Sequence, residues 1–544
     1  MQRARQSFNL VIPRNNATRN PYCHDAASTI PRITRNDKTT ACLILALIFT
    51  LTSLSCSYSH SDPQTVTLII EASPLNLDPR VGIDAFSERI GQLLFDGLVR
   101  RDEHFNLQPA LAERWDIPDP LTYIFHLRQG VHFHNGQLMS SRDVKWTFDS
   151  MFNGTVITSK TGAYQYVNSV EAPDDRTVIF RLKEPFSALL WSLADGAIGI
   201  VPYGSGKEFA QHPIGTGIFK LIKNEQDNEV IIVRNDDYWG EKAKIERARL
   251  AVVPDTTTRA LELRKGSADI EINSLPPDML PTLRAEPNLR IAQAPGTSLN
   301  YLAMNLRDPI LRDVRVRQAL NYAIDRTPIL HYLWRDTARP ADSILPPQHW
   351  AYDDHLPHYA YDPGKARALL DAAGYPMKNG VRFRLTIKSS TDEAPRIIAS
   401  VLQQQLRAVG IELDIRTFEF ATFFSDITKG AYQLYTLRWV GGTNQDPDVF
   451  EYVFHSASFP PKRANRSFYS NPQVDAWIEE GRREVDQAKR KAIYSKVQQQ
   501  LAIDLPHIYL WYLDNVIVHT ARIRNLQPSL AGNYDFLRTI SVEP

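Results

Sequence analysis

Two histidines, at positions 132 and 134, are the first residues whose type and spacing could do chemistry. On a strand, His132 and His134 would point to the same face, where two imidazoles can chelate a transition metal. Gly130, Asn135 and Gly136 bracket the pair as they would a hairpin, and no carboxylate or cysteine follows at ligand spacing. We therefore expect no metal site at these histidines.

Motifs for nucleotide binding and for nucleophilic catalysis are incomplete or missing. Gly215-Thr216-Gly217 begins like a dinucleotide loop, but Lys220 stands where the third glycine is required. Gly206-Lys207 lacks the upstream glycine and the following Ser or Thr of a phosphate loop. The sequence contains neither G-x-S-x-G nor H-E-x-x-H. These residues predict a protein that is not an enzyme and needs no cofactor.

The segment Arg438–Asp448, RWVGGTNQDPD, has a different character. It follows an apolar and aromatic run, and it combines a tryptophan, paired glycines, amides and carboxylates without helical or strand periodicity. Such a loop can bring backbone groups and polar side chains to a small molecule beside an aromatic wall. The same composition also suits a rigid turn whose polar groups bond to one another, so the residues alone leave both interpretations open.

Short strands and one crossover unit surround these segments. The alternation and β-branched residues predict strands at 65–71, 123–128 and 177–182. Further on, Asp362-Pro363 predicts the start of a helix that Gly374 ends. A strand at 382–388, a helix around 398–406 and a strand at 411–415 follow, which predicts two parallel strands joined by a right-handed crossover.

Two longer helical patterns complete the secondary structure. Apolar residues at spacings of three and four predict one buried helix from Val314 to Trp334. A charged pattern from Pro472 to Ile503 predicts a second helical region that breaks near Gly481. The chain is therefore α/β with several units, and no stretch has the composition of a flexible tether.

Length, charge and cysteine content narrow the class of protein. The chain has 544 residues, enough for three or four domain-sized units, with 43% hydrophobic and 23% charged residues. Residues 56–544 carry 55 basic and 59 acidic side chains, a net charge of −4, which argues against nucleic acid as a partner. The three cysteines are Cys23, Cys42 and Cys56, so the rest of the chain can form no disulfide framework.

Residues 1–55 read as a leader and signal segment. The apolar run 41–54 is short for a membrane span and suits the apolar part of a secretory signal, with Arg32, Arg35 and Lys38 before it. Ser55-Cys56 resembles the lipobox of bacterial lipoproteins, although Ser53 stands where that pattern prefers Leu. We expect export to the periplasm, with either a lipidated Cys56 or ordinary signal cleavage.

Several ordered motifs give the chain a family resemblance. These are YIFHLRQGVHFHNGQLMSSRDVKWTFDSM (123–151), GTGIFKL (215–221), NDDYWG (235–240), NYLAMNL with RDVRVRQALNYAIDR (300–326), and YDPGKARALLDAAGY (361–375). With these motifs in this order, the chain resembles family 5 of the bacterial extracellular solute-binding proteins, which serve ABC importers and include oligopeptide-, dipeptide- and nickel-binding proteins.

The resemblance implies a two-lobed periplasmic-binding-protein fold of type II, with an extra subdomain and the ligand cleft between the lobes. By resemblance, lobe I comprises 66–97, 205–296 and 514–544, its extra subdomain is 98–204, and lobe II is 297–513. The implied function is the substrate-binding component of an ABC importer that delivers a peptide or peptide-like solute to a permease. The resemblance thus implies two partners, that solute and the permease subunits. It also implies that the protein is a monomer.

One departure from the family concerns the second-lobe loop. Dipeptide and oligopeptide binders of the family carry an Asp shortly after the loop tryptophan, where it pairs with the peptide α-ammonium. Here that position falls at Gly442 or Thr443, and Asp446 matches the later Asp-Pro of the family. We therefore expect less dependence on a free α-ammonium. The residues expected at the ligand are Ser73, Asn76, Tyr301, Asn305, Trp439, Gly442, Thr443, Asn444 and Asp446.

Two functional alternatives stay open at this point. One is an exported hydrolase that acts on peptides, which turnover of a candidate peptide by the pure protein would reveal. The other lies within the family and is a binder of a non-peptide solute or of a metal chelate.

Overall fold

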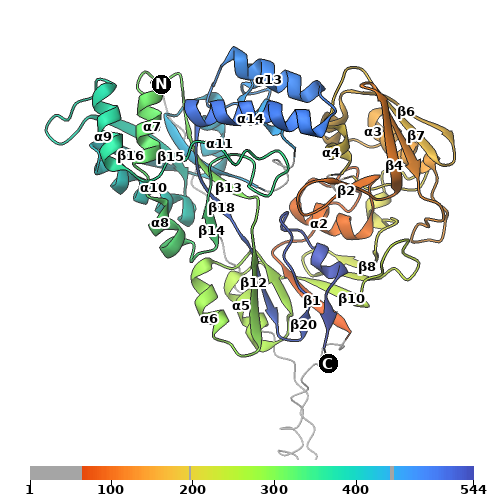
Figure 1. The fold of residues 1–544 in the computed structure, drawn as a ribbon. Helices are drawn as coiled ribbons and strands as arrows, with labels where there is room; N and C mark the ends of the chain where they lie inside the picture. The colour runs from red at the N-terminus through yellow and green to blue at the C-terminus, as the bar shows by residue number, and fades with distance from the viewer. Residues whose placement is uncertain (1–63, 195–197, 441–445, 544) are drawn as a thin grey trace, which may run out of the picture. The chain divides into compact units, whose positions relative to one another are not determined.

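The computed structural model describes residues 64–194, 198–440 and 446–543, all within one compact unit, Ser61–Pro544 (Figure 1). The predicted leader 1–55 and Cys56 lie outside the described residues. Within the described ranges, no helix has both the length and the apolar character needed to cross a bilayer.

A seven-stranded mixed sheet contains the first strand of the described chain, β1 (Thr65–Ile70), all six of whose residues are buried. β1 runs parallel to both of its neighbours, β10 and β11, and therefore lies inside the sheet. Its buried faces explain why the strand is a continuous β-branched and apolar run rather than an alternating one. In spatial order the strands are β12 (Leu289–Ala294), β19 (Asn515–Thr520), β11 (Ile270–Ile272), β1 (Thr65–Ile70), β10 (Arg247–Val252), β9 (Glu229–Arg234) and β8 (Phe219–Glu225). The helices from the same parts of the chain are α2 (Ala85–Leu94), α5 (Thr256–Lys265) and α6 (Leu280–Arg284).

A separate four-stranded antiparallel sheet contains two of the predicted strands. β5 and β7 pair from Thr122↔Arg181 to His126↔Thr177, and their inward aromatic residues join one apolar core with α3. The order is β4 (Ala112–Asp119), β5 (Thr122–Leu127), β7 (Thr177–Leu182) and β6 (Val167–Asp174), with helices α3 (Ser141–Phe152) and α4 (Leu189–Leu193). Small sheets pair β2 (Val99–Arg101) with β3 (Leu107–Pro109), and β20 (Ile523–Arg524) with β21 (Ser541–Val542).

A six-stranded sheet contains the predicted crossover unit. β15 and β16 are parallel from Phe383↔Ile411 to Ser390↔Phe418 and are joined by α10, which confirms the predicted parallel pair. The strand order is β14 (Ala338–Pro340), β18 (His507–Leu513), β13 (Leu299–Met304), β17 (Leu434–Trp439), β15 (Phe383–Ser390) and β16 (Ile411–Phe418).

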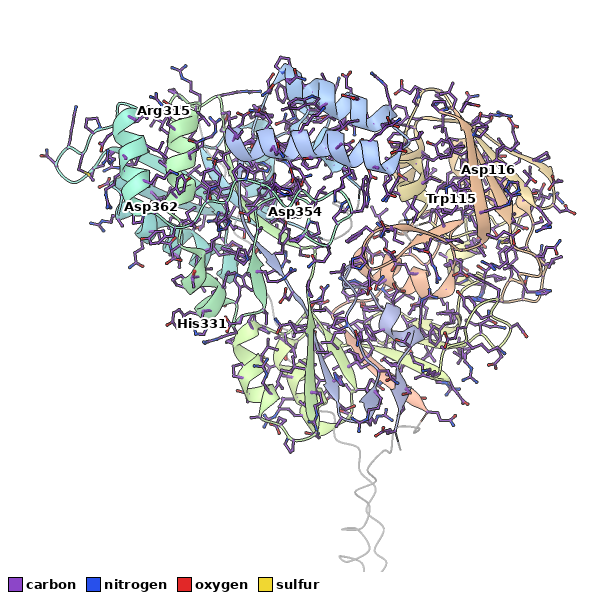
Figure 2. All side chains as sticks on the ribbon, in the orientation of Figure 1. Trp115, Asp116, Arg315, His331, Asp354 and Asp362 are labelled. Atoms are coloured by element: carbon purple, nitrogen blue, oxygen red, sulfur yellow. The ribbon has the colours of Figure 1, made fainter. Side chains whose placement is uncertain are left out.

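Helices cover both faces of this six-stranded sheet. One face packs against α7 (Val314–Tyr322), α9 (Pro363–Ala372) and α10 (Glu393–Arg407). The other packs against α11 (Phe420–Lys429), α12 (Val449–Phe454), α13 (Pro472–Arg483) and α14 (Gln487–Asp504). The start of α9 is as predicted, since the Asp362 carboxylate accepts from the Lys365 N–H at 2.8 Å, and Figure 2 labels Asp362 beside this helix.

The predicted single helix from Val314 to Trp334 is wrong. α7 ends at Tyr322, a short helix α8 (Arg326–Pro328) follows, and a π-helical turn covers Ile329–Leu333. The Asp325 carboxylate caps the new start by accepting from the Thr327 N–H, and Pro328 has no N–H with which to continue the first helix. The buried face predicted for this segment nonetheless persists in the apolar core.

The break predicted near Gly481 lies three residues further on. α13 continues through Gly481 to Arg483, and α14 begins after Asp486 caps it. A Cβ at position 481 would lie 2.7 Å from the Tyr494 ring of α14. This glycine therefore allows two helices to approach closely rather than ending one of them.

The chain passes between the seven- and six-stranded sheets at two places that lie side by side. β12 and β19 pair up to Ala294↔Asn515, and β13 and β18 pair from Leu299↔Tyr512, so 295–298 and 513–514 connect the two sheets. Each of the three large sheets draws its strands from one of the three parts proposed by resemblance. The lobe and subdomain boundaries themselves stay a prediction.

Candidate ligand-binding site

The end of β17 forms an aromatic wall. Trp439, the last residue of the strand, stacks on Tyr301 of β13 with ring centroids 5.8 Å apart and planes 12° apart. Tyr452 of α12 approaches the edge of Trp439 at 6.5 Å. The Trp439 indole N–H is buried and meets no acceptor among the described residues.

Tyr301 is the buried member of this stacked pair. Its side chain is fully buried, and its ring also packs 4.7 Å from His507 and 6.0 Å from Tyr435. Burial raises the pKa of Tyr301 well above its ordinary value, so the phenol stays neutral. The structure thus brings Tyr301 and Trp439 together, with Trp439 as the more accessible ring.

Asn305 fixes the backbone instead of presenting a free amide. Its Nδ2 donates to the carbonyls of Gly430 and Tyr432 at 3.1 and 2.9 Å, and its Oδ1 accepts from the Arg307 N–H at 3.1 Å. These bonds hold the turn that leads from α11 into β17. Asn305 can position the strand that carries Trp439.

Asp446 is engaged by a buried arginine. Its two carboxylate oxygens accept from Nη1 and Nη2 of Arg490 at 2.8 and 2.6 Å, and one also accepts from the Asp448 N–H. Arg490 is fully buried, and its guanidinium lies 4.9 Å from Trp191 and 5.6 Å from Trp350. Asp446 therefore anchors the far end of the loop.

The first-strand loop uses its polar groups internally. Ser73 Oγ accepts from the Asp227 N–H at 2.7 Å, which ties this loop to the β8–β9 turn. Asn76 Oδ1 accepts from the Asp78 N–H at 2.8 Å. These bonds shape the loop, and none of them reaches the aromatic wall at Trp439.

The remaining expected site residues are Gly442, Thr443 and Asn444, which lie outside the described residues. The ligand contacts expected at all nine positions stay predictions.

A contact between the four-stranded-sheet segment and α13 was missed by sequence reasoning. The Ser187 N–H donates to the Arg482 carbonyl at 2.9 Å, and Arg482 Nη2 donates to the Tyr166 hydroxyl at 3.2 Å. Arg482 also pairs with Asp448 at 2.7 Å. The helix pattern marks Arg482 only as a charged residue. No local signal shows that its side chain bonds to Tyr166, which lies 316 positions away in the sequence.

The two connecting segments are braced by side chains. The Leu513 N–H donates to the Ser298 carbonyl at 2.8 Å, and Asp514 accepts from Arg339 at 2.6 Å and from Gln293 at 2.7 Å. A Cβ at Gly296 would lie 2.3 Å from the Leu513 carbonyl oxygen, so the two segments pass too closely for another side chain. This pair of segments can serve as a hinge.

One of the two histidines, His134, contacts the glycine motif. His134 Nδ1 accepts from the Gly215 N–H at 3.3 Å, and Nε2 donates to the Gly217 carbonyl at 3.0 Å. Burial lowers the pKa of His134 to about 4, which keeps the ring neutral for both bonds. His134 thus clamps a turn, and both of its nitrogens are engaged.

One group on the described surface has metal-ligand spacing. One possible ligand atom from each of Asp353, Asp354 and His355 lies within 4.8 Å of the other two, and Asp354 is labelled in Figure 2. The Asp353 carboxylate already accepts from Ser495 and Gln499 at 2.7 and 2.8 Å. These bonds give the group a role in fixing the loop to α14.

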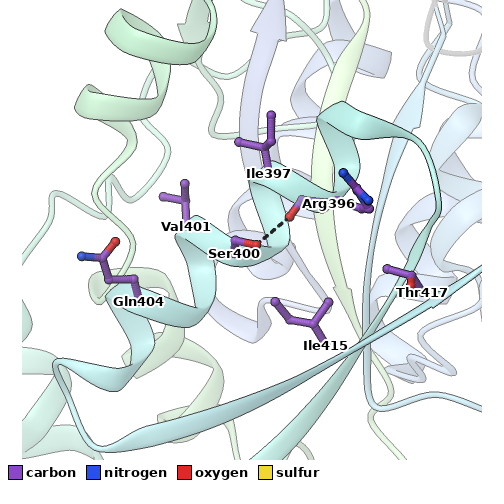
Figure 3. A pocket seen from close by; sticks show the side chains of 7 residues that line it. All are labelled: Arg396, Ile397, Ser400, Val401, Gln404, Ile415 and Thr417. Atoms are coloured by element: carbon purple, nitrogen blue, oxygen red, sulfur yellow. Dashed lines mark hydrogen bonds between the residues drawn. The ribbon is translucent and has the colours of Figure 1, made fainter.

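Two hollows lie away from the wall. One, of about 460 Å³, lies between α10 and the edge strand β16, lined by Arg396, Ser400, Thr417 and neighbours (Figure 3). Another, of about 610 Å³, lies between β2 and the C-terminal segment 527–539. Asp96 lines it and accepts from Trp239 and Thr216 at 2.9 and 3.1 Å. Neither hollow is lined by Ser73, Asn76, Tyr301, Asn305, Trp439 or Asp446, the expected ligand residues that the structure describes.

Comparison with known families decides the class. The family model for the middle region of bacterial extracellular solute-binding proteins, family 5, matches residues 106–460. The chain belongs to this family. Its fold is accordingly the two-lobed fold of the periplasmic solute-binding proteins, as the sequence motifs predicted.

Individual relatives agree with this assignment. The glutathione-binding protein of Pectobacterium atrosepticum is 30% identical, over 80% of this chain and 86% of that protein. The dipeptide-binding protein of Escherichia coli is 28% identical, over 80% of this chain and 86% of that protein. The solved structure of HbpA2 from Haemophilus parasuis is 26% identical with a TM-score of 0.79, over 88% of this chain and 100% of that one.

Proposed function

We propose that the protein is the substrate-binding component of an ABC importer that captures a peptide or peptide-like solute outside the cytoplasmic membrane. Membership of family 5 carries this proposal, because its members are solute-binding proteins. The relatives named for glutathione and dipeptide binding favour a solute with peptide-type groups. Transport then consists of capture, closure and release to the permease, without a chemical step on the solute.

The geometry suits a solute held at the end of the six-stranded sheet where the connecting segments 295–298 and 513–514 lie. Trp439 offers an apolar face and an unpartnered indole N–H at the end of β17. The connecting segments 295–298 and 513–514 run beside the neighbouring strands β13 and β18. Both Asp446 oxygens accept from Arg490, so this carboxylate is poorly placed to pair with a peptide ammonium. We infer that a free α-ammonium contributes less here than in relatives that carry the loop Asp.

Mass spectrometry of the protein under native conditions tests the proposal. The purified protein, offered a mixture of di- and tripeptides, should retain a subset of them, and those recovered after denaturation should have unchanged masses. Shortened peptides in the mixture would instead favour the alternative of an exported hydrolase. Failure to retain any peptide would overturn peptide capture and favour a non-peptide solute or a metal chelate.

We further propose a periplasmic location with a lipid anchor on Cys56. The basic residues, the apolar run 41–54 and the cysteine at its end support this proposal. Cys56→Ser should move the protein from the membrane fraction to the soluble fraction. A wild-type protein that is already soluble, with a mature N-terminus other than Cys56, would contradict the anchor.

A further inference from the structure

Strand β16 ends the six-stranded sheet, and among the described strands β15 is its neighbour on one side alone. The side toward β15 is visible in two backbone bonds. The Gly410 carbonyl accepts from the Arg382 N–H at 2.7 Å, and the Phe418 carbonyl accepts from the Thr391 N–H at 3.0 Å. Backbone groups of successive residues alternate between the two sides of a strand, so the even-numbered residues of β16 face β15.

The odd-numbered residues of β16 face away from the sheet. The Leu413 carbonyl accepts from Nε2 of Gln403 on α10 at 2.6 Å, which places it on the outer side. Ile415 and Thr417 follow at spacings of two, so their N–H and C=O groups point outward as well. An open edge of this kind can pair with a further strand.

The hollow of about 460 Å³ beside α10 lies on this open edge (Figure 3). The strand contributes Ile415 and Thr417, and one face of α10 contributes Ile397, Val401 and other residues at spacings of three and four. Ile397 is 37% exposed, and Val401 and Ile415 are half-buried. A strand added beside β16 would lie about 4.8 Å away and place side chains under this flank of α10.

The other face of the edge carries two opposite charges. Asp414 and Arg416 are exposed and form an ion pair with each other at 2.9 Å. Their side chains point away from α10, because they alternate with Leu413 and Ile415, which pack in or against the core beneath that helix. The two charges therefore lie on either side of Ile415 along the edge.

This arrangement of charges is complementary to a second copy of itself. When two β16 strands pair antiparallel about a two-fold axis at Ile415, Asp414 of each copy lies directly opposite Arg416 of the other. An axis at Asp414 or at Arg416 would instead place two like charges opposite each other, which destabilises a sheet. The sequence of the edge thus favours one register out of three.

We propose that this edge is a dimer interface, at which β16 pairs antiparallel with β16 of a second copy about a two-fold axis at Ile415. Ile415 pairs with its counterpart and Leu413 with Thr417, and both residues of each pair exchange their backbone hydrogen bonds. The Leu413 carbonyl can keep its bond to Gln403, since a carbonyl oxygen has two lone pairs.

The two-fold axis also joins the hollows. The α10 helices of both copies lie on the same face of the joined sheet, so their flanks at Ile397 and Val401 meet over the paired strands. Such a contact is closed, and assembly stops at two copies. The dimer departs from the monomer implied by the family resemblance. It leaves β17 and Trp439 uncovered at the edge, since β15 lies between β17 and β16.

Sedimentation equilibrium of the purified protein at several concentrations tests the interface. Wild type should form a dimer in a concentration-dependent manner. Asp414→Arg and Arg416→Asp each place like charges opposite each other at both cross-strand pairs, so each should raise the dissociation constant of the dimer about tenfold or more. The matched control Asp236→Arg reverses an exposed carboxylate that pairs with Arg234, also two residues away, and should leave dimerisation unchanged.

Mixing the two reversal variants tests the register. The edge of Asp414→Arg is basic and that of Arg416→Asp is acidic, so an equimolar mixture should form mixed dimers about as tightly as wild type. The double variant, in which the charges are exchanged, should also recover dimerisation. A mixture that stays monomeric, or a dimer that does not respond to either reversal, would overturn the proposal. A wild-type protein that is monomeric at every concentration would overturn it as well.

Thr417→Pro tests the backbone pairing separately from charge. The Thr417 side chain is exposed and its N–H faces outward, so proline at this edge position removes a bond that only a second copy can make. The variant should dimerise at least about tenfold more weakly than wild type. Its urea midpoint should match that of wild type at a dilution at which both are monomers. An unchanged dissociation constant in this variant would contradict strand pairing at β16.

Discussion

Asp446→Asn is expected to lower the free energy of unfolding by about 3–5 kcal/mol, the cost of leaving one partner of a buried ion pair alone. Arg490 is fully buried and relies on both Asp446 oxygens. The asparagine can accept one of the two bonds but carries no charge. Urea unfolding at neutral pH, followed by tryptophan fluorescence, measures the loss.

Two further variants isolate the cause of this loss. Asp354→Asn changes an exposed carboxylate and should leave the stability within about 0.5 kcal/mol of wild type. Asp446→Asn combined with Arg490→Met removes the buried charge as well and should recover most of the loss. A single Asp446→Asn variant as stable as wild type would show that the ion pair contributes little.

Acid is expected to destabilise the protein through His507, which is 2% exposed and has both ring nitrogens without a partner among the described residues. Burial, with a smaller effect of Arg466, lowers the pKa of His507 to about 3 from the ordinary 6.5. The unfolded chain therefore takes up a proton near pH 6.5, and the folded chain does so only near pH 3. Stability is unaffected above pH 6.5 and falls between these values, by up to about 1.4 kcal/mol per pH unit.

His507→Leu should reduce this acid dependence, since leucine has a similar volume and does not titrate. Urea unfolding at pH 7.5 and pH 5.0 gives the difference for wild type, for His507→Leu and for the exposed control His212→Leu. The loss on acidification should be smaller in His507→Leu alone. Equal losses in all three proteins would mean that His507 does not govern the acid response. His134, whose pKa is about 4, should contribute in the same direction.

Local signals explain which elements could be predicted from the sequence. β7 follows Asp174-Asp175 and alternates in burial along Thr177–Leu182, so its bounds match the prediction. The start of α9 depends only on Asp362 and Pro363. The helix predicted to run to Trp334 is wrong because the apolar spacing continues across Asp325, which caps the start of a new short helix.

The site could be predicted only in part. The aromatic and glycine composition of 438–448 pointed to the end of β17, where Trp439 stacks on Tyr301. The partner of Asp446 is Arg490, 44 residues away on a helix whose basic residues do not show which of them is buried. The pairing of Asn300 with Arg438 on one side and with Trp511 on the other depends on strand register between distant segments, which a single sequence does not specify.

Closure around a captured solute is the central claim, and X-ray scattering of the free and the loaded protein tests it most directly. A hinge at 295–298 and 513–514 predicts that a peptide retained in native mass spectrometry lowers the radius of gyration at saturation. Identical scattering curves for the free protein and for a protein shown to hold its peptide would contradict this account.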